Sequence, residues 1–331
     1  MHQKPESAAR TARLAERARS RPMGTRPRDL AGPRGGSQPD AQPRDASSPA
    51  TLGARLIGQL STALFFALHL ACLGVFLVPF AWKLVALALA GYALRMWAIT
   101  GGYHRYFAHR SYKTSRPFQL LLAWLGASAM QNGPLWWASV HRRHHRHSDE
   151  PLDPHSPKEG FWHAHAGWFL SGRWNDLDLT NVQDLAVYPE LRFVERWSWL
   201  PIVTHAVACF VVAGVPGLVW GFAVSTVLVI QATMLINSLS HVWGTRRYET
   251  GDTSRNNALL AVLTFGEGWH NNHHHFQSSA RQGFFWWELD VTYLVLRVLA
   301  RLGVVWRLRV PSATALAGPR VRSPARAGGA A

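Results

Sequence analysis

The sequence predicts an all-α membrane protein, in which four transmembrane helices are capped by a cytoplasmic helical domain that holds a histidine-rich metal centre. Three observations lead to this prediction. Apolar runs long enough to cross a bilayer alternate with polar stretches. The 17 histidines gather mainly in those polar stretches. Much of the net charge of +16 lies in the two ends of the chain and beside the apolar runs.

The two ends of the chain differ in composition from the middle. Residues 1–50 are rich in Arg, Ala, Pro, Ser and Gly and contain no apolar run. Such a composition cannot bury a core, so this segment is predicted to be a disordered basic tail. It also lacks the apolar region of a signal peptide. Residues 306–331 are predicted to form a flexible C-terminal tail, which leaves residues 51–305 as the membrane domain.

Four apolar segments are long enough, or nearly so, to span a membrane. They are residues 56–80, 84–100, 199–213 and 218–236. A short link makes the first two segments a helical hairpin, and the sequence Gly214-Val215-Pro216-Gly217 marks a turn between the last two. Residues 118–130 are too short to cross, and residues 289–302 suit an amphipathic helix in the membrane interface.

The charge distribution sets the orientation of these spans. An even number of spans places both termini on one side of the membrane. The links on the opposite side carry almost no charge, only Lys83, whereas the termini and the long polar segments carry nearly all the Lys and Arg. The positive-inside rule therefore places both termini and every histidine cluster in the cytoplasm. The same distribution argues against nucleic-acid binding, the other common interpretation of a basic chain.

Three histidine clusters lie in the polar segments. They are His104 and His109, then His141, His144 and His145, and finally His270, His273 and His274. Residues at i, i+3 and i+4 share one face of a helix, and imidazole binds divalent transition metals. The spacing suits one metal ion or two. The only cysteines, Cys72 and Cys209, lie in apolar runs, so no cysteine-based metal site is expected.

Some histidines need a special local structure to join such a site. His104 and His109 are five residues apart, roughly 140° around an ideal α-helix, so we expect a helix end or local unwinding near Gly101-Gly102. Asn237 and His241 lie at i and i+4 where the fourth span reaches the cytoplasmic face. By contrast, four histidines have no clear partner and are not expected among the main ligands: His147, His155, His163 and His275.

These motifs resemble those of the integral-membrane fatty acid desaturases, most closely the acyl-CoA Δ9 (stearoyl-CoA) desaturase group. The matching text is GGYHRYFAHRSY, GPLWWASVHRRHHRHSD, DPHSPKEGFWHAHAGW, NSLSH and GEGWHNNHHHF, in order across roughly residues 52–300. The resemblance implies an O2-dependent oxidoreductase that inserts a cis double bond, at the Δ9 position, into a saturated fatty acyl-CoA.

Two other functions are compatible with the same sequence features. Membrane hydroxylases and desaturases of lipid-linked acyl groups share the histidine clusters. A metal-binding or metal-transporting membrane protein is an alternative of a different class. Transporters place ionisable ligands near the middle of the bilayer, whereas the histidine clusters here lie outside the apolar spans, which argues against transport.

The resemblance also implies a cofactor and its ligands. It implies a non-haem di-iron centre, with O2 as co-substrate. One iron would be held by His104, His109, His145 and His274, with Asn237 acting through a water molecule. The other would be held by His141, His144, His241, His270 and His273. Gln131, Trp137 and Thr233 match the residues that shape the bend of an apolar acyl tunnel in relatives.

The remaining expectations concern charge and partners. Acidic side chains near the clusters are expected to accept hydrogen bonds from ligand histidines: Asp149, Glu150, Asp153, Asp252 and Glu267. The chain contains no sequence like cytochrome b5. Electrons are therefore expected from a separate donor of the ferredoxin, rubredoxin or cytochrome b5 type. The other partners expected are membrane lipid and an acyl substrate, as acyl-CoA or acyl-lipid.

Overall fold

A computed structural model describes residues 52–321, with side chains from residue 59 onward, and this part of the chain is mostly helical. The predicted N-terminal tail lies outside the described residues. Residues 306–321 depart from the flexible tail expected there. They are held to the rest of the protein, for example by the backbone N–H of Glu249, which donates to the carbonyl of Pro319 over 2.9 Å.

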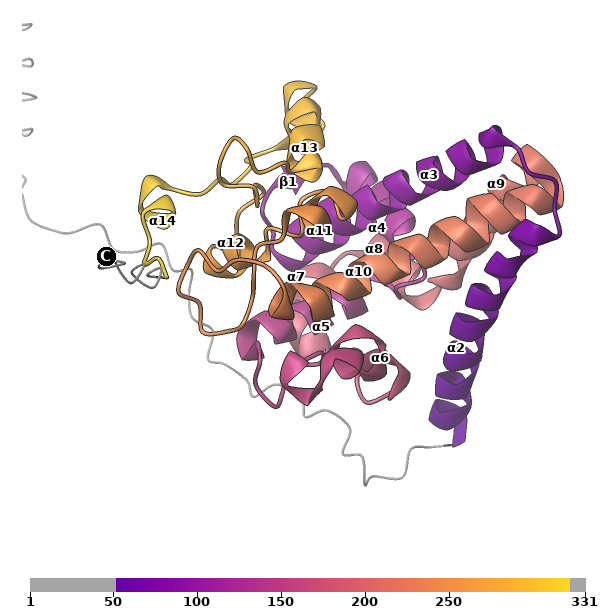
Figure 1. The fold of residues 1–331 in the computed structure, drawn as a ribbon, viewed down its shortest axis with the longest axis horizontal. Helices are drawn as coiled ribbons and strands as arrows, with labels where there is room; N and C mark the ends of the chain where they lie inside the picture. The colour runs from indigo at the N-terminus through magenta and orange to yellow at the C-terminus, as the bar shows by residue number, and fades with distance from the viewer. Residues whose placement is uncertain (1–51, 322–331) are drawn as a thin grey trace, which may run out of the picture. The chain divides into compact units, whose positions relative to one another are not determined.

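The long apolar helices form one of the two parts of the structure, and a more polar region forms the other (Figure 1). They are α2 (Leu52–Ala71), continued by the 3-10 helix η1 (Cys72–Phe76); α3 (Trp82–Trp97), continued by the π-helix η2 (Ala98–Ala108); α9 (Trp199–Gly217); the π-helix η6 (Leu218–Val224); and α10 (Ser225–Val242). Among the described residues, three continuous runs are long and apolar enough to cross a membrane: Gln59–Phe76, Trp82–Ala108 and Trp199–Val242.

The third run contains a reversal of the chain. Ala213 and Gly214 have non-helical backbone angles, and the φ of Gly214 is +60°, a conformation that glycine adopts without a steric penalty. Two residues on opposite sides of this point are in contact: Nε2 of His205, before it, lies 3.2 Å from the carbonyl oxygen of Gly221, after it. Sixteen residues of unbroken helix would separate the two by about 24 Å. The helix α9 therefore packs alongside η6, and the turn predicted at this point is confirmed.

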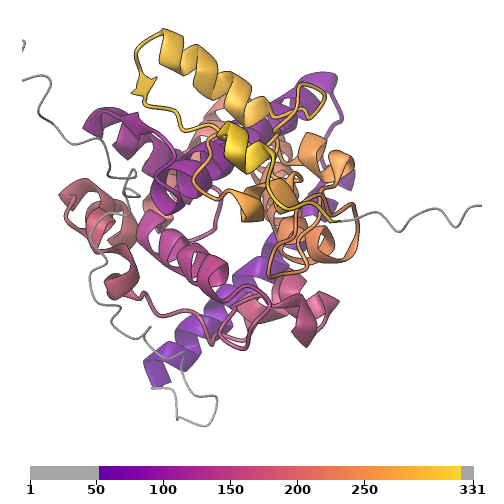
Figure 2. The same cartoon turned by 90° about the vertical axis from the view of Figure 1, so that its left-hand side faces the viewer.

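Shorter elements make up the polar part. The helices are α4 (Arg116–Ala127), α5 (Pro134–His147), α6 (Trp168–Leu170), α7 (Gln183–Ala186), α8 (Pro189–Arg196), α11 (Ala258–Leu263), α12 (His270–His275), α13 (Val291–Arg301) and α14 (Ala313–Leu316). Between them lie η3 (Pro157–Glu159), the π-helix η4 (His163–Gly167) and η5 (Leu179–Val182), and β1 (Lys113–Thr114) pairs antiparallel with β2 (Val305–Trp306). Figures 1 and 2 show α11 and α12 gathered near the end of α10 that lies away from its turn with α9.

The main hydrophobic core lies between η2, α4 and α5. Every residue of η2 is buried, and Tyr103 and Phe107 pack with Leu122 of α4 and Leu135 of α5. At Gly126 the helix α4 comes so close to η2 that a Cβ atom would lie 2.2 Å from the ring of Tyr103. This contact fixes the position of η2, which carries the first histidine cluster.

The N-terminus of α5, the helix that carries the second cluster, is capped from a distance. Gly133 has no side chain to serve as a cap, and Oε2 of Glu195 on α8 instead accepts hydrogen bonds from the backbone N–H groups of Leu135 and Trp136, at 2.8 and 3.2 Å. A carboxylate at this end of a helix also interacts favourably with the helix dipole.

We expect Glu195→Ala to lower the free energy of unfolding by about 1–2 kcal/mol, because two N–H groups lose their acceptor. Glu195→Gln keeps an acceptor oxygen and should lose less. Thermal unfolding of the purified protein in detergent measures both variants. An alanine variant as stable as the parent protein would show that this contact does not hold α5 in place.

Candidate metal centre

The first cluster lies at the C-terminal end of the π-helix η2. Its backbone forms i to i+5 hydrogen bonds, and the N–H of His109 donates to the carbonyl of His104 over 3.1 Å. The wider turn of a π-helix brings residues five apart towards the same face, which an α-helix does not do. The ring centroids of His104 and His109 consequently lie 4.7 Å apart. This is the local unwinding that the spacing of the two residues required.

Nine histidines from four helical regions come together in two groups. The five-histidine group consists of His104, His109, His141, His145 and His273, and the four-histidine group consists of His144, His241, His270 and His274. Within each group one nitrogen from every residue lies within 4.8 Å of the others. The nine histidines expected as ligands are thus all brought together.

The division between the groups differs from the one that the resemblance implied. His141 and His273 lie with His104 and His109, and His274 lies with His144 and His241. Helix geometry explains the difference. Residues at i and i+4 are only about 40° apart around a helix, so they stay together, whereas the residue at i+3 diverges from i+4 by about 100° and reaches the other group.

The Nε2 atoms converge inside each group. In the five-histidine group, successive Nε2 atoms lie 2.9–3.0 Å apart along the series His104, His273, His145, His141 and His109. In the four-histidine group, His241 and His270 are separated by 3.1 Å. Metal–nitrogen bonds of about 2.1 Å at right angles keep neighbouring ligand nitrogens roughly 3 Å apart, so this spacing fits a shared metal ion.

Carboxylates fix the protonation of several rings. Nδ1 of His144 lies 2.9 Å from Asp153, and Nδ1 of His274 lies 2.6 Å from Asp252. A carboxylate accepts a hydrogen bond, so we infer that Nδ1 carries the proton and Nε2 an unshared pair. Those two Nε2 atoms face each other at 3.4 Å. Two unshared pairs in this arrangement repel unless a cation lies between them, so the residues fit a metal ion.

Burial favours the neutral form of several of these imidazoles. It lowers the pKa of His145, His270 and His273 well below the ordinary value, and neighbouring histidines lower it further. The neutral ring is the form that binds a metal. An all-imidazole donor set suits iron, copper, zinc or nickel.

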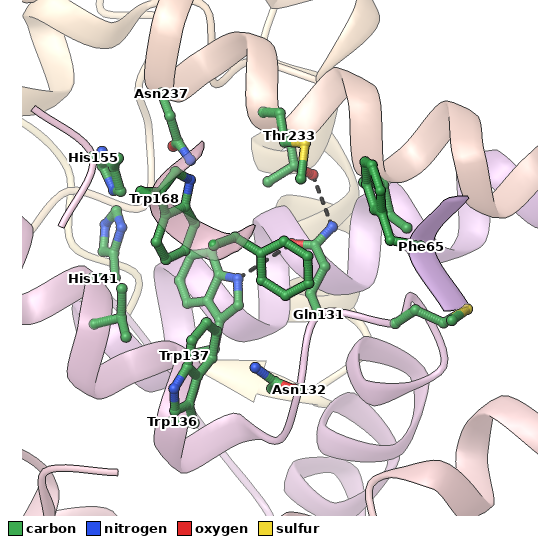
Figure 3. A pocket seen from close by; sticks show the side chains of 15 residues that line it. Phe65, Gln131, Asn132, Trp136, Trp137, His141, His155, Trp168, Thr233 and Asn237 are labelled. Atoms are coloured by element: carbon green, nitrogen blue, oxygen red, sulfur yellow. Dashed lines mark hydrogen bonds between the residues drawn. The ribbon is translucent and has the colours of Figure 1, made fainter. Parts of the chain in front are cut away.

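An apolar cavity of about 700 Å³ opens beside the centre (Figure 3). Gln131, Trp137 and Thr233, the three residues expected to shape a tunnel, meet in its wall. The side-chain amide of Gln131 donates to Thr233 over 3.0 Å, and Nε1 of Trp137 donates to Gln131 over 3.3 Å. Phe65 and Ile230 contribute to its apolar lining.

A second cavity of about 480 Å³ shares part of its lining with the first. The residues that line both cavities are Trp137, His141, His155, Thr233 and Asn237. The second cavity is also lined by His104, His144 and His270, which come from both histidine groups, and by the apolar residues Met96 and Ile99. Two adjoining apolar cavities therefore lie beside the two groups.

Comparison with known proteins agrees with this geometry. Residues 80–309 match the family model described as fatty acid desaturase. The chain belongs to the fatty acid desaturase family.

Several relatives support the same assignment. An acyl-CoA C20 Delta5-desaturase of Anemone leveillei is 40% identical over 251 residues, which are 74% of this chain and 80% of the relative. Delta-9 acyl-lipid desaturase 1 of Arabidopsis thaliana is 40% identical over 254 residues, 74% of this chain and 81% of the relative. An sn-1 stearoyl-lipid 9-desaturase of Anabaena variabilis is 37% identical over 257 residues, 77% of this chain and 94% of the relative.

The other histidines in the described part of this desaturase lie outside the two groups. His147 pairs with Glu150, His163 lies beside Glu159, and His275 stacks on Tyr248. Glu150, which was expected to accept a hydrogen bond from a ligand histidine, thus contacts His147 instead.

His155 is the residue whose position the sequence did not reveal. Its buried ring lies 4.2 Å from that of His144, and it lines both cavities. The only signal was its place two residues after Asp153, which holds His144.

Proposed function

We propose that this desaturase uses two iron ions and O2 to insert a cis double bond, at the Δ9 position, into a saturated fatty acyl chain. The observation that carries the proposal is the pair of adjoining apolar cavities, the second of which is lined by histidines of both groups. A methylene chain lying in these cavities has no polar group to offer the protein. The fit of the cavity walls therefore decides which carbon pair lies beside the histidines.

The two histidine groups would hold the iron ions. When bound, they supply the oxidising power needed to remove hydrogen from an unactivated methylene group. The chain's own residues do the rest. Asp153 and Asp252 orient ligand rings, and the apolar walls limit the access of water. Asn237 precedes His241 by one turn of α10 and lines both cavities, so we place it, acting through a water molecule, with the four-histidine group.

We also propose that the acyl chain is carried as acyl-CoA. The motifs NSLSH and HAHAGW favour acyl-CoA. The relatives at about 40% identity include an acyl-CoA desaturase and an acyl-lipid desaturase, so a lipid-linked acyl group is the second candidate. The other candidate reaction is hydroxylation of the acyl chain, which analysis of the products distinguishes from desaturation.

We further propose that the chain crosses the membrane four times, with the histidines and both termini on the cytoplasmic side. The three apolar runs, the third of which reverses at Gly214, support four crossings. The distribution of Lys and Arg supports the orientation. A separate ferredoxin, rubredoxin or cytochrome b5 would then deliver electrons from the cytoplasm.

Expression in a desaturase-deficient host tests the function. Mass spectrometry of the extracted lipids locates new double bonds, and purified membranes supplied with stearoyl-CoA or with stearoyl lipid distinguish the carriers. A new Δ9 olefin from the acyl-CoA supports the full proposal. Hydroxylated acyl chains would indicate the hydroxylase, and folded, iron-loaded protein that forms no product would overturn the proposal.

We expect Thr233→Val to broaden the position of the double bond. The change keeps the shape of the side chain but removes the hydroxyl that accepts from Gln131, so the amide can turn and the bend in the cavity loosens. A second positional isomer should appear among the products, with iron content unchanged. Thr204→Val is the matched control, since Thr204 lies on α9, is exposed and bonds only to the carbonyl of Pro201. A single product from both variants would contradict the assigned role.

A further inference from the structure

Three aspartates lie behind the four-histidine group. Asp153 and Asp252 contact Nδ1 of His144 and His274, as described above, and Asp149 lies 3.5 Å from Nδ1 of His241. Backbone N–H groups hold all three carboxylates in place, at 2.6–3.0 Å. Within the part of the chain that the structure describes, no Lys or Arg forms an ion pair with them. This side of the centre therefore carries three negative charges without a cation.

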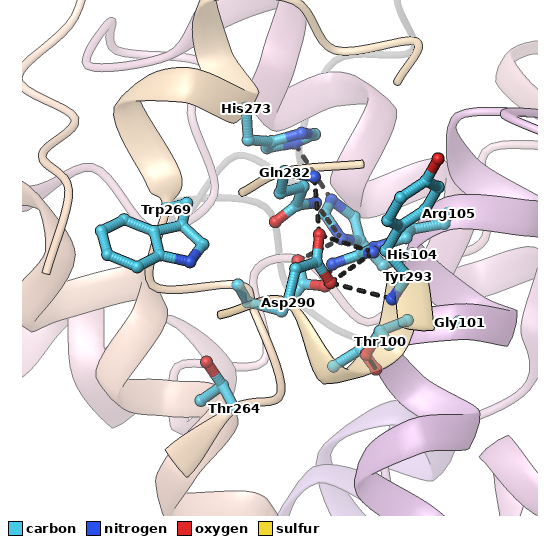
Figure 4. Close-up of polar contacts among 12 residues, drawn as sticks. Thr100, Gly101, His104, Arg105, Thr264, Trp269, His273, Gln282, Asp290 and Tyr293 are labelled. Carbon is cyan, nitrogen blue, oxygen red and sulfur yellow. Dashed lines mark hydrogen bonds and ion pairs between the residues drawn. The ribbon is translucent and has the colours of Figure 1, made fainter. Parts of the chain in front are cut away.

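The five-histidine group has a different environment (Figure 4). Nδ1 of His104 lies 2.5 Å from Glu267, but Arg105 lies 3.1 Å from the same carboxylate and 2.9 Å from Asp290. Arg105 is fully buried, so water does not screen its charge. Two negative charges and one positive charge leave a net charge of −1.

The other four histidines of this group have no such partner. Among residues 59–321, no carboxylate forms an ion pair with any of them: His109, His141, His145 and His273. The Nδ1 atoms of His145 and His273 are buried without a hydrogen-bond partner. The charges around the two groups are therefore unequal, at −3 and −1.

This inequality acts on the charge of a bound ion. Buried negative charges stabilise a trivalent metal ion more than a divalent one, because the Coulomb attraction grows with the charge of the ion. Water and salt screen this attraction little in a buried site. Carboxylates hydrogen-bonded to Nδ1 also make the ring a stronger donor. The fifth imidazole of the other group is neutral and adds no net charge.

We propose that the two iron positions are unequal, and that Fe(II) in the four-histidine group is the first to lose an electron and become Fe(III). The inference rests on the proposed function, since it requires iron in both groups. Arg105 doubles the difference in charge, from one unit to two, because it offsets a negative charge beside the five-histidine group. It acts through Glu267 and His104 and is a positioning residue.

A redox titration of the iron-loaded full-length protein tests the proposal. Soluble mediators accept the electrons one at a time, and Mössbauer spectra of ⁵⁷Fe count the ferric ions. The parent protein should show two steps. Asp252→Asn should make the first oxidation harder, with the ferric-to-ferrous ratio at a fixed potential falling about tenfold, a shift of about 59 mV. Glu267→Gln should leave that step unchanged and shift only the second.

Asp178→Asn is the matched control. Asp178 is also buried, pairs with Arg143 over 2.9 Å and caps a helical turn, but it lies in neither group. It should shift neither step. Two irons that oxidise at one potential, or a first step moved by Glu267→Gln rather than Asp252→Asn, would overturn this inference and leave the proposed function standing. A folded parent protein that holds no iron would overturn both.

Discussion

His144→Ala is expected to abolish olefin formation and to remove the metal from the four-histidine group. The side chain is 1% exposed, and its Nε2 faces that of His274 while its Nδ1 contacts Asp153. The variant loses one of the converging nitrogens and removes the imidazole that contacts the buried carboxylate of Asp153, which is costly in a region that excludes water. Iron per chain, measured on purified protein, should fall to about half or less, and products should fall below detection.

His147→Ala is the matched control on the same helix. His147 lies one turn further along α5, contacts Glu150 at the surface, and belongs to neither group. Its replacement should leave iron content unchanged and activity within about twofold of the parent. Equal iron content and equal product in the His144 variant would contradict the assignment of the four-histidine group as a metal site.

Gly126→Ala is expected to prevent the normal packing of η2 and so to lower the yield of folded protein severely. The added Cβ would lie 2.2 Å from the ring of Tyr103, and this ring cannot move aside because it is completely buried. Overpacking of this kind costs about 1–3 kcal/mol, and more where the neighbour is rigid. Since Tyr103 precedes His104, the surviving protein should also bind less iron.

Gly251→Ala separates this clash from the general effect of replacing a glycine. Nothing lies within 4 Å of a Cβ built at Gly251, and its backbone φ is not in the left-handed region. The variant should elute, unfold and bind iron like the parent. Thermal unfolding and monodisperse yield in detergent measure both variants, and a Gly126 variant as stable as the control would refute the packing argument.

The apolar helices were predictable because the hydropathy of each run depends on many residues and not on one or two. The structure has helices over most of each predicted span, the turn near Gly214, and the short helix expected at residues 118–130, which appears as α4. The first span ends at Phe76 and not at residue 80. The boundaries were less certain. The second apolar run extends to Ala108 rather than to residue 100, since η2 continues α3 without a break.

The membership of the histidine site was predictable, but its internal arrangement was not. Spacing shows that His141, His144 and His145 share one side of a helix. Which of them meets His104 depends on how α5, α12 and η2 are placed around one another, which is a property of packing and not of spacing. The role of Arg105 was hidden for the same reason, because its partners Glu267 and Asp290 lie far away in the sequence.

The convergence of nine buried imidazoles has a consequence for the life of the protein in the cell. Without a cation, closely facing nitrogens cost free energy, so metal binding and completion of the fold are thermodynamically linked. If the two groups hold iron as proposed, a chain made when iron is scarce remains nearer its unfolding threshold and is a better substrate for membrane proteases. The abundance of the protein, and with it the fluidity of the membrane, would then follow the iron supply with no dedicated sensor.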